Sequence, residues 1–302
     1  MNPVVRLFLA PDRRLRPSWR FWISVVVFGF SIGFAGALAV AVRKAGYGIG
    51  AEFVFRTAWL VFMLLGFALL LYALDRVRGY VLRAMGLGLD RAALRDSLVG
   101  TALGAGMVAA TVAVMGVAGR VEFHWVGGWP RVVPAILAVT YIIAVAAMAE
   151  EVAFRGYPFQ RLVEGIGAPG GILLLSVLFG AVHLGNPHAS IWGFLNTIEI
   201  GVFLAIAYLR TRSLWMPWGV HFGWNFTLGV VFGLPVSGFT DFAIAVQGTA
   251  TGPLWLTGGS YGIEASLTAT LVIVASFFVL LRLTPARAVP PAPLPELAKA
   301  PE

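Results

Sequence analysis

The sequence contains no cysteine, which excludes disulfides, thiolate metal sites and cysteine nucleophiles. It also contains little charge, because only 12% of its 302 residues are Asp, Glu, Lys or Arg. Soluble domains carry roughly 25% charged residues, so this chain has too little polar surface to coat a water-soluble globule. A His-Glu-x-x-His pair, the helical zinc signature of one class of metalloenzymes, is also absent from the sequence.

Acidic residues are fewer than basic residues. The sequence has 14 Asp and Glu and 22 Lys and Arg, which gives a formal net charge of +8. A basic chain can indicate a nucleic-acid partner. Here the basic residues lie between apolar runs and do not gather on one polar face, so no nucleic-acid partner is expected. The expected surroundings are membrane lipids.

Long apolar runs dominate the chain, which is 59% hydrophobic. A helix needs about 20 apolar residues to cross the hydrocarbon core. The first run is longer than the core of a cleaved signal peptide, so a retained first span is expected. The runs predict an all-α, polytopic transmembrane helix bundle of about eight spans. They are 21–42, 55–74, 97–117, 132–150, 170–186, 190–209, 214–233 and 265–283.

The positions of the basic residues predict the orientation. With eight spans and both termini in the cytoplasm, 17 of the 22 basic residues face inward. We therefore expect a multi-pass protein of the inner (plasma) membrane. The stretch 75–96 mixes apolar and basic residues and is expected to lie on the cytoplasmic surface as an amphipathic segment.

Glycines four residues apart let transmembrane helices approach closely. The sequence has three such pairs inside or beside the expected spans, and each is expected to mark a close helix contact. The pairs are Gly29/Gly33, Gly100/Gly104 and Gly229/Gly233.

The fourth span ends with two adjacent carboxylates, Glu150 and Glu151. Charged groups inside a bilayer cost at least ~2.5–3.5 kcal/mol each, so they indicate function or pairing. Arg155 follows Glu151 by four residues and can pair with it, whereas Glu150 points about 100° away. Gly156 is expected to end the helix about 9 Å beyond Glu150. The plainer interpretation is that these charges mark a helix end at the interface.

Further polar residues lie on the later spans. His183 follows Phe179 by four residues in the fifth span, and His221 and Asn225 share one face of the seventh. The plainer interpretations are a packed histidine and hydrogen bonds between helices. Glu199 in the sixth span can line a cavity, pair with an arginine or be structural. Together, the polar groups of three spans are expected to meet in one cavity open to the cytoplasm.

These residues form three motifs in order: EEVAFR at 150–155, FGAVH at 179–183 and HFGWN at 221–225. They resemble, without a departure, the EExxxR, FxxxH and HxxxN motifs of the CAAX prenyl endopeptidase and bacteriocin-processing family, known as CPBP or Abi membrane proteases. With this resemblance the chain divides into an N-terminal part of three spans, a catalytic core, an outer loop with the last span, and a disordered cytoplasmic tail. These parts are 1–131, 132–233, 234–284 and 285–302.

The resemblance implies an endopeptidase that cleaves peptides or membrane-tethered proteins. By position, Glu150 would activate a water molecule with help from His183, and the water would attack a peptide carbonyl. His221 and Asn225 would donate hydrogen bonds to the tetrahedral oxyanion, which can lower the barrier by several kcal/mol.

The same resemblance assigns supporting roles to Glu151 and Arg155, which would hold the helix end and tune the site. The family has also been described as metalloproteases. In that version Glu150, His183 and His221 would bind zinc and leave a fourth position open. We favour the version without a metal or cofactor, although the spacing does not choose between them.

Two other functions stay open at this stage. Intramembrane Glu and His also build the relays of proton- or ion-coupled transporters. Against a transporter, the sequence has no duplicated half with paired broken helices. The motifs can also be idle, in a non-enzymatic bacteriocin-immunity or scaffold protein of the membrane.

Overall fold

A computed structural model describes residues 3–77 and 79–284 of the chain. Its long helices are α2 (Pro17–Lys44), α3 (Gly48–Ala73), α5 (Arg91–Val117), α6 (Trp129–Arg155), α7 (Tyr157–His183), α8 (Ile191–Thr211), α9 (Trp215–Phe226) and α11 (Leu267–Leu283). Shorter elements are α1 (Pro3–Phe8), α4 (Val81–Ala84), β1 (Val121–Trp125), η1 (Thr227–Val231), β2 (Val246–Ala250), α10 (Leu254–Thr257), η2 (Gly259–Tyr261) and η3 (Ile263–Ala265). The tail 285–302 expected from the sequence lies outside the described residues.

The expected all-α membrane fold is confirmed. Among the described residues, five helical stretches are long and apolar enough to cross a membrane: α2, most of α3, α5, the continuous stretch Val132–His183, and α8. The stretch Val132–His183 contains α6 and α7, which meet at Gly156. α11 is also apolar but has only 17 residues. The total of eight spans and the positions of the termini stay predictions.

Several expected boundaries differ from the structure. α7 begins at Tyr157 and not at 170, because Pro158 suits the first turn of a helix. It bends near Gly167, where φ is 79°, just before Pro169. In the predicted span 214–233 the α-helix ends at Phe226, and a single π-helical turn follows.

The expected amphipathic segment 75–96 is not one helix. It contains the four-residue helix α4 and then the first residues of α5. Asp90 starts α5 because its side chain accepts a hydrogen bond from the backbone N–H of Ala93 at 2.9 Å.

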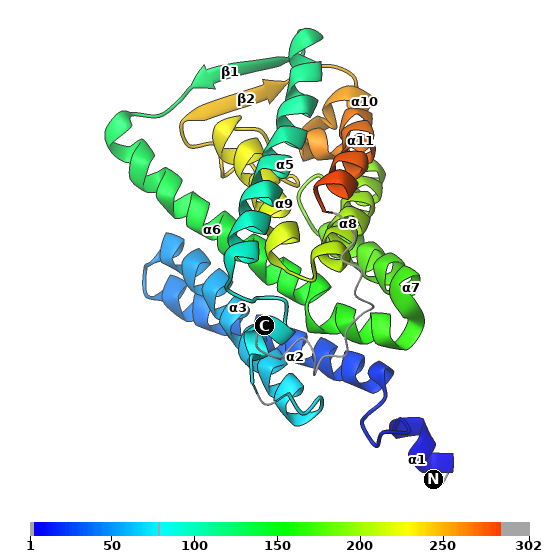
Figure 1. The fold of residues 1–302 in the computed structure, drawn as a ribbon. Helices are drawn as coiled ribbons and strands as arrows, with labels where there is room; N and C mark the ends of the chain where they lie inside the picture. Colours follow the sequence, from blue (N-terminus) through cyan, green and yellow to red (C-terminus); the bar gives the residue numbers. More distant parts are fainter. Residues whose placement is uncertain (1–2, 78, 285–302) are drawn as a thin grey trace.

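A two-stranded antiparallel ribbon was not expected from the sequence. β1 pairs with β2 in the register Val121↔Ala250 to Trp125↔Val246. Figure 1 shows this ribbon at one end of α5, while the α2–α3 pair lies near the other end. The ribbon therefore ties the start of α6 to the long connection before α11.

α5 and α9 pack closely through small residues. A Cβ atom added at Gly104 of α5 would meet the carbonyl oxygen of Val220, and one added at Gly223 of α9 would meet that of Thr101. The expectation for Gly29/Gly33 is wrong, because no atom of the described residues lies within 4 Å of a Cβ at either position. Gly229 lies in η1, and Gly233, with φ of 58°, belongs to the turn after it.

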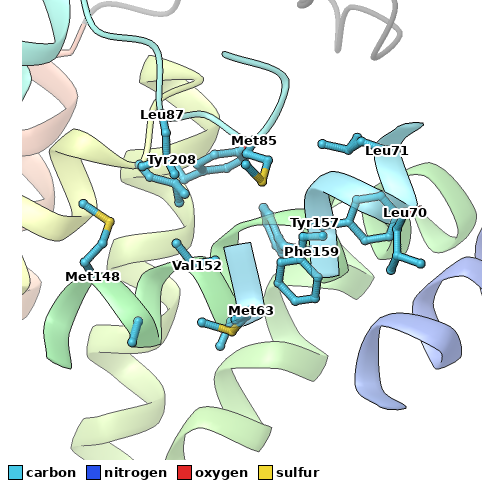
Figure 2. Close-up of a cluster of buried hydrophobic side chains, with 14 of the residues drawn as sticks. Met63, Leu70, Leu71, Met85, Leu87, Met148, Val152, Tyr157, Phe159 and Tyr208 are labelled. Carbon is cyan, nitrogen blue, oxygen red and sulfur yellow. The ribbon is translucent and has the colours of Figure 1, made fainter. Parts of the chain in front are cut away.

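Buried apolar side chains fix the end of α6 that carries Glu150. Figure 2 shows them gathered from α3, α6, α7 and α8 together with Met85 and Leu87, which follow α4. Met148 and Val152 of α6 belong to the same cluster. The turn of α6 that carries Glu150 is therefore fixed by this buried apolar cluster.

A buried ionic cluster joins the α2–α3 pair to α7. Asp75, directly after α3, contacts Arg20 of α2 and accepts a hydrogen bond at 2.9 Å from Arg161 of α7. Glu164 contacts both arginines, and its distance to Arg161 is 2.7 Å. Because breaking such a buried pair is costly, this cluster fixes α2 and α3 as a wall beside α7.

Candidate active site

One pocket of about 470 Å³ contains the four side chains expected to carry the chemistry. Glu150 comes from α6, His183 from the end of α7, and His221 and Asn225 from α9. Three helices, the consecutive α6 and α7 and the later α9, therefore contribute these side chains to one pocket. Their chemical roles stay a proposal.

Glu150 faces both histidines. Its Oε2 atom is 4.0 Å from Nε2 of His183 and 3.8 Å from Nε2 of His221. This oxygen is buried and has no hydrogen-bond partner among the described residues. The distances exceed a direct hydrogen bond and suit groups bridged by a small polar molecule.

His183 is oriented by its own helix. Its Nδ1 lies 2.7 Å from the carbonyl oxygen of Phe179, one turn earlier. A carbonyl only accepts, so Nδ1 carries the proton. In the neutral ring Nε2 is then a hydrogen-bond acceptor aimed at Glu150. The Phe179 ring lies against His183 with centroids 4.5 Å apart, which fixes the imidazole further.

Glu151 is buried next to this site and accepts hydrogen bonds from two other motif residues. Its Oε1 atom accepts from Arg155 Nη1 at 3.1 Å and from His221 Nδ1 at 2.9 Å. Arg155 also donates to the carbonyl oxygen of Gly201 on α8 at 3.3 Å. The guanidinium lies over the Phe179 ring at 4.4 Å. The two adjacent glutamates thus have different surroundings, one facing the pocket and one inside the protein.

A second carboxylate in the pocket, that of Glu264, was not expected from the sequence. It lies in η3 and lines the same cavity. Its carboxylate accepts from Trp224 Nε1 at 2.9 Å and from the backbone N–H of Ser237. Burial raises the pKa of Glu264 above its usual range, although these two hydrogen bonds oppose the shift. A single acid in an expected loop gives no sequence signal for such a position.

Glu199 and the two histidines outside the three motifs lie elsewhere. Glu199 of α8 does not line this pocket, so its interpretation as part of the cavity gains no support. His124 lies exposed in β1 with Nε2 3.8 Å from Glu122. His188 lies in the turn between α7 and α8 with φ of 56°.

The zinc version requires Glu150, His183 and His221 to converge on one ion. No group of three His, Cys, Asp or Glu side chains among the described residues is placed to hold a metal. Zinc bonds of about 2.0–2.2 Å in a tetrahedral site bring ligand atoms to about 3.4 Å from one another. The distances of 3.8 and 4.0 Å exceed this, so the side chains as placed do not fit zinc.

Residues 132–227 match the family model described as "Type II CAAX prenyl endopeptidase Rce1-like". This segment holds all three motifs and the four pocket residues. Over this segment, about a third of the chain, the sequence is similar to the CPBP family. The match leaves the first three long helices and α11 outside the CPBP segment.

The chain is also similar to a curated protein described as a membrane peptidase. The chain is 28% identical over 120 residues to a Bacillus subtilis (strain 168) protein named "Putative membrane peptidase YdiL". The alignment covers 36% of this chain and 47% of the relative, so the chain spans about half the length of this relative. No solved structure matches the chain significantly.

Proposed function

We propose that this protein is a glutamate-dependent endopeptidase of the CPBP type in the inner membrane, and that it cleaves peptides or membrane-tethered proteins. The observation that carries the proposal is the buried Oε2 atom of Glu150, which faces two imidazole Nε2 atoms inside a pocket. The family description and the name of the Bacillus relative both point to peptide-bond cleavage at membranes.

The first step activates water. A water molecule between Glu150 and His183 can donate one hydrogen to Oε2 of Glu150 and the other to Nε2 of His183. Glu150 takes a proton as the water oxygen attacks the peptide carbonyl, which forms the C–O bond of a tetrahedral intermediate. Glu150 then returns this proton to the amine that leaves when the C–N bond breaks.

The second requirement is stabilisation of the oxyanion. Asn225 lies one turn beyond His221 and offers an amide N–H from the same helix face. The Nδ1 hydrogen of His221 is directed to Glu151, so only the doubly protonated ring also offers an Nε2–H. The hydrogen bond to Glu151 fixes the orientation of the His221 ring. Arg155 keeps Glu151 in place for this role.

The decisive experiment compares purified wild type with Glu150→Gln, which keeps the shape but removes the base. In lipid nanodiscs, we expect wild type to cleave membrane-tethered or CAAX-like peptides and Glu150→Gln to lose this activity by at least roughly 10²-fold. Glu122→Gln is the control, because this glutamate is exposed on β1 and lies outside the pocket.

Other outcomes would select another function. Equal cleavage by Glu150→Gln and wild type would overturn the proposed role of Glu150. Solute flux in liposomes without cleavage would support the transporter. An unchanged physiological effect of Glu150→Gln in cells would support an idle, scaffold or immunity role.

A metal chelator tests the metalloendopeptidase version separately. Because the site residues as placed do not fit zinc, we expect 1,10-phenanthroline to leave peptide cleavage within about two-fold of the untreated rate, against a far larger loss for a zinc enzyme. Cleavage that is lost with the chelator and restored by added zinc would contradict the metal-free mechanism.

A further inference from the structure

The pocket extends from Glu150 to a second wall on α3. Arg56 and Trp59 of this wall line the same cavity as Glu150. They are three residues apart and so share one face of the helix. Ile142 and Ala146 of α6 line the space between the two ends. The arm that leads to α3 is therefore largely apolar and contains one permanent positive charge.

Both residues on this wall have a buried N–H group without an acceptor. Neither Nε of Arg56 nor Nε1 of Trp59 has a hydrogen-bond partner among the residues that the structure describes. The Glu52 carboxylate stands 3.7 Å from Nε of Arg56, beyond hydrogen-bond distance. Buried donors without acceptors are costly, so two of them on one pocket wall indicate a ligand with acceptor oxygens.

One contact between α3 and α6 gives the approximate separation, measured along α6, between this wall and Glu150. Thr57 and Tyr141 share a hydrogen bond of 2.7 Å between their hydroxyl groups, so this part of α3 is level with Tyr141 of α6. Glu150 follows Tyr141 by nine residues, or about 13 Å along the helix. An extended peptide covers about 3.3 Å per residue, so about four residues span this distance.

We propose that Arg56 and Trp59 bind a carboxylate of the peptide substrate, about four residues from the bond next to Glu150. This inference rests on the proposed function. A guanidinium stays charged at any physiological pH, and N–H groups of Arg and Trp match carboxylate oxygens. A lipid phosphate has the same acceptor chemistry, so the experiment must separate the two sources.

The test uses two peptides that extend four residues beyond the cleaved bond, one with a free C-terminal carboxylate and one with a C-terminal amide. In nanodiscs of zwitterionic lipid, wild type should cleave the acid with a kcat/KM roughly ten- to a hundred-fold above that of the amide. Arg56→Gln should remove this preference, and Arg56→Lys should retain part of it. Trp59→Phe keeps the ring and should weaken the preference.

Arg43→Gln is the matched control. Arg43 contacts the same Glu52 at 3.5 Å, but its side chain is 67% exposed and does not line the pocket. Its removal should leave the preference for the acid unchanged. An equal loss in Arg43→Gln and Arg56→Gln would overturn the proposal.

Binding to the inactive Glu150→Gln variant separates this inference from the proposed function. If the acid binds better than the amide and Arg56→Gln abolishes the difference, the carboxylate site stands even when no peptide is cleaved. Cleavage that depends on Glu150 without any acid preference would overturn the carboxylate site alone. Arg56-dependent binding of anionic lipid, without acid preference among peptides, would assign the wall to headgroups and also overturn it.

Discussion

Glu150 and Glu151 are adjacent in the chain but have different chemical surroundings. One residue of α-helix turns a side chain by about 100°, so one carboxylate faces the pocket and the other faces the interior. The side chain of Glu151 has no exposed surface, and that of Glu150 is 22% exposed. This difference assigns reaction with water to Glu150 and support to Glu151 in the proposed mechanism.

Removal of the Asn225 amide should affect the transition state more than substrate binding. We expect Asn225→Ala to lower kcat by roughly 10²–10³-fold with little change in KM, because an oxyanion donor acts mainly on the transition state. Steady-state kinetics in nanodiscs measure this. A mutant that raises KM at unchanged kcat would assign Asn225 to substrate binding.

The buried Glu151–Arg155 pair predicts an effect on folding. Arg155→Met leaves the Glu151 carboxylate buried and without its arginine partner, which should destabilise the protein by about 3–5 kcal/mol. Thermal unfolding in detergent measures this. Arg83→Met removes a half-exposed ion pair with Asp90 and should cost at most about 1 kcal/mol. Equal losses of stability in Arg155→Met and Arg83→Met would contradict this prediction.

At the scale of elements, the geometry of the site depends on how α9 packs against α5. α9 carries His221 and Asn225. It packs against α5 at glycine positions of both helices, where no side chain separates the two backbones. A methyl group on this surface must push the two helices apart. The position of the two proposed oxyanion donors is therefore set by residues that never touch a substrate.

Gly104→Ala tests this dependence. Its new methyl group would meet the backbone of α9 at Val220 and Trp224, so we expect a loss of about 1–3 kcal/mol in stability together with lower activity. Gly106→Ala on the same helix is the control, because nothing lies within 4 Å of its Cβ position. The melting temperature and the peptide-cleavage rate of Gly106→Ala should both be close to those of wild type.

The connection between η1 and α11 reaches the pocket through Glu264. Burial raises the pKa of Glu264, so its contribution to stability is complete below the ordinary range of a glutamate, about 4, and is lost as pH rises through the raised pKa. Glu264→Gln stays neutral at every pH. We therefore expect the melting temperature of wild type to fall relative to Glu264→Gln as pH rises. A constant difference across pH would contradict this.

At the scale of the whole molecule, the basic residues predict which parts face the cytoplasm. The chain has no cysteine, so single cysteines can report the topology. Glu122→Cys in the exposed ribbon should react with a membrane-impermeant maleimide in intact cells. Arg83→Cys in α4 should react only after permeabilisation. The opposite pattern would show that the predicted orientation is wrong.

Composition and spacing by themselves determined the membrane class and the pairing of Glu151 with Arg155. Both follow from local rules, namely the length of apolar runs and the geometry of one helical turn. The ordered motifs also indicated the family, because their residues lie on separate spans in a fixed order. The sequence thus indicated which polar side chains within the apolar spans were candidates for the site.

Only the tertiary structure decided where those side chains meet and what surrounds them. The β1–β2 ribbon, the approach of Glu264 and the burial of the Arg56 and Trp59 N–H groups, which have no acceptor in the described part of the chain, all depend on contacts between distant segments. Such contacts leave no periodic pattern in the chain, since each involves one or two residues brought together by packing. The glycine pairs illustrate this, because identical spacing gave a close helix contact at Gly100/Gly104 and open space at Gly29/Gly33.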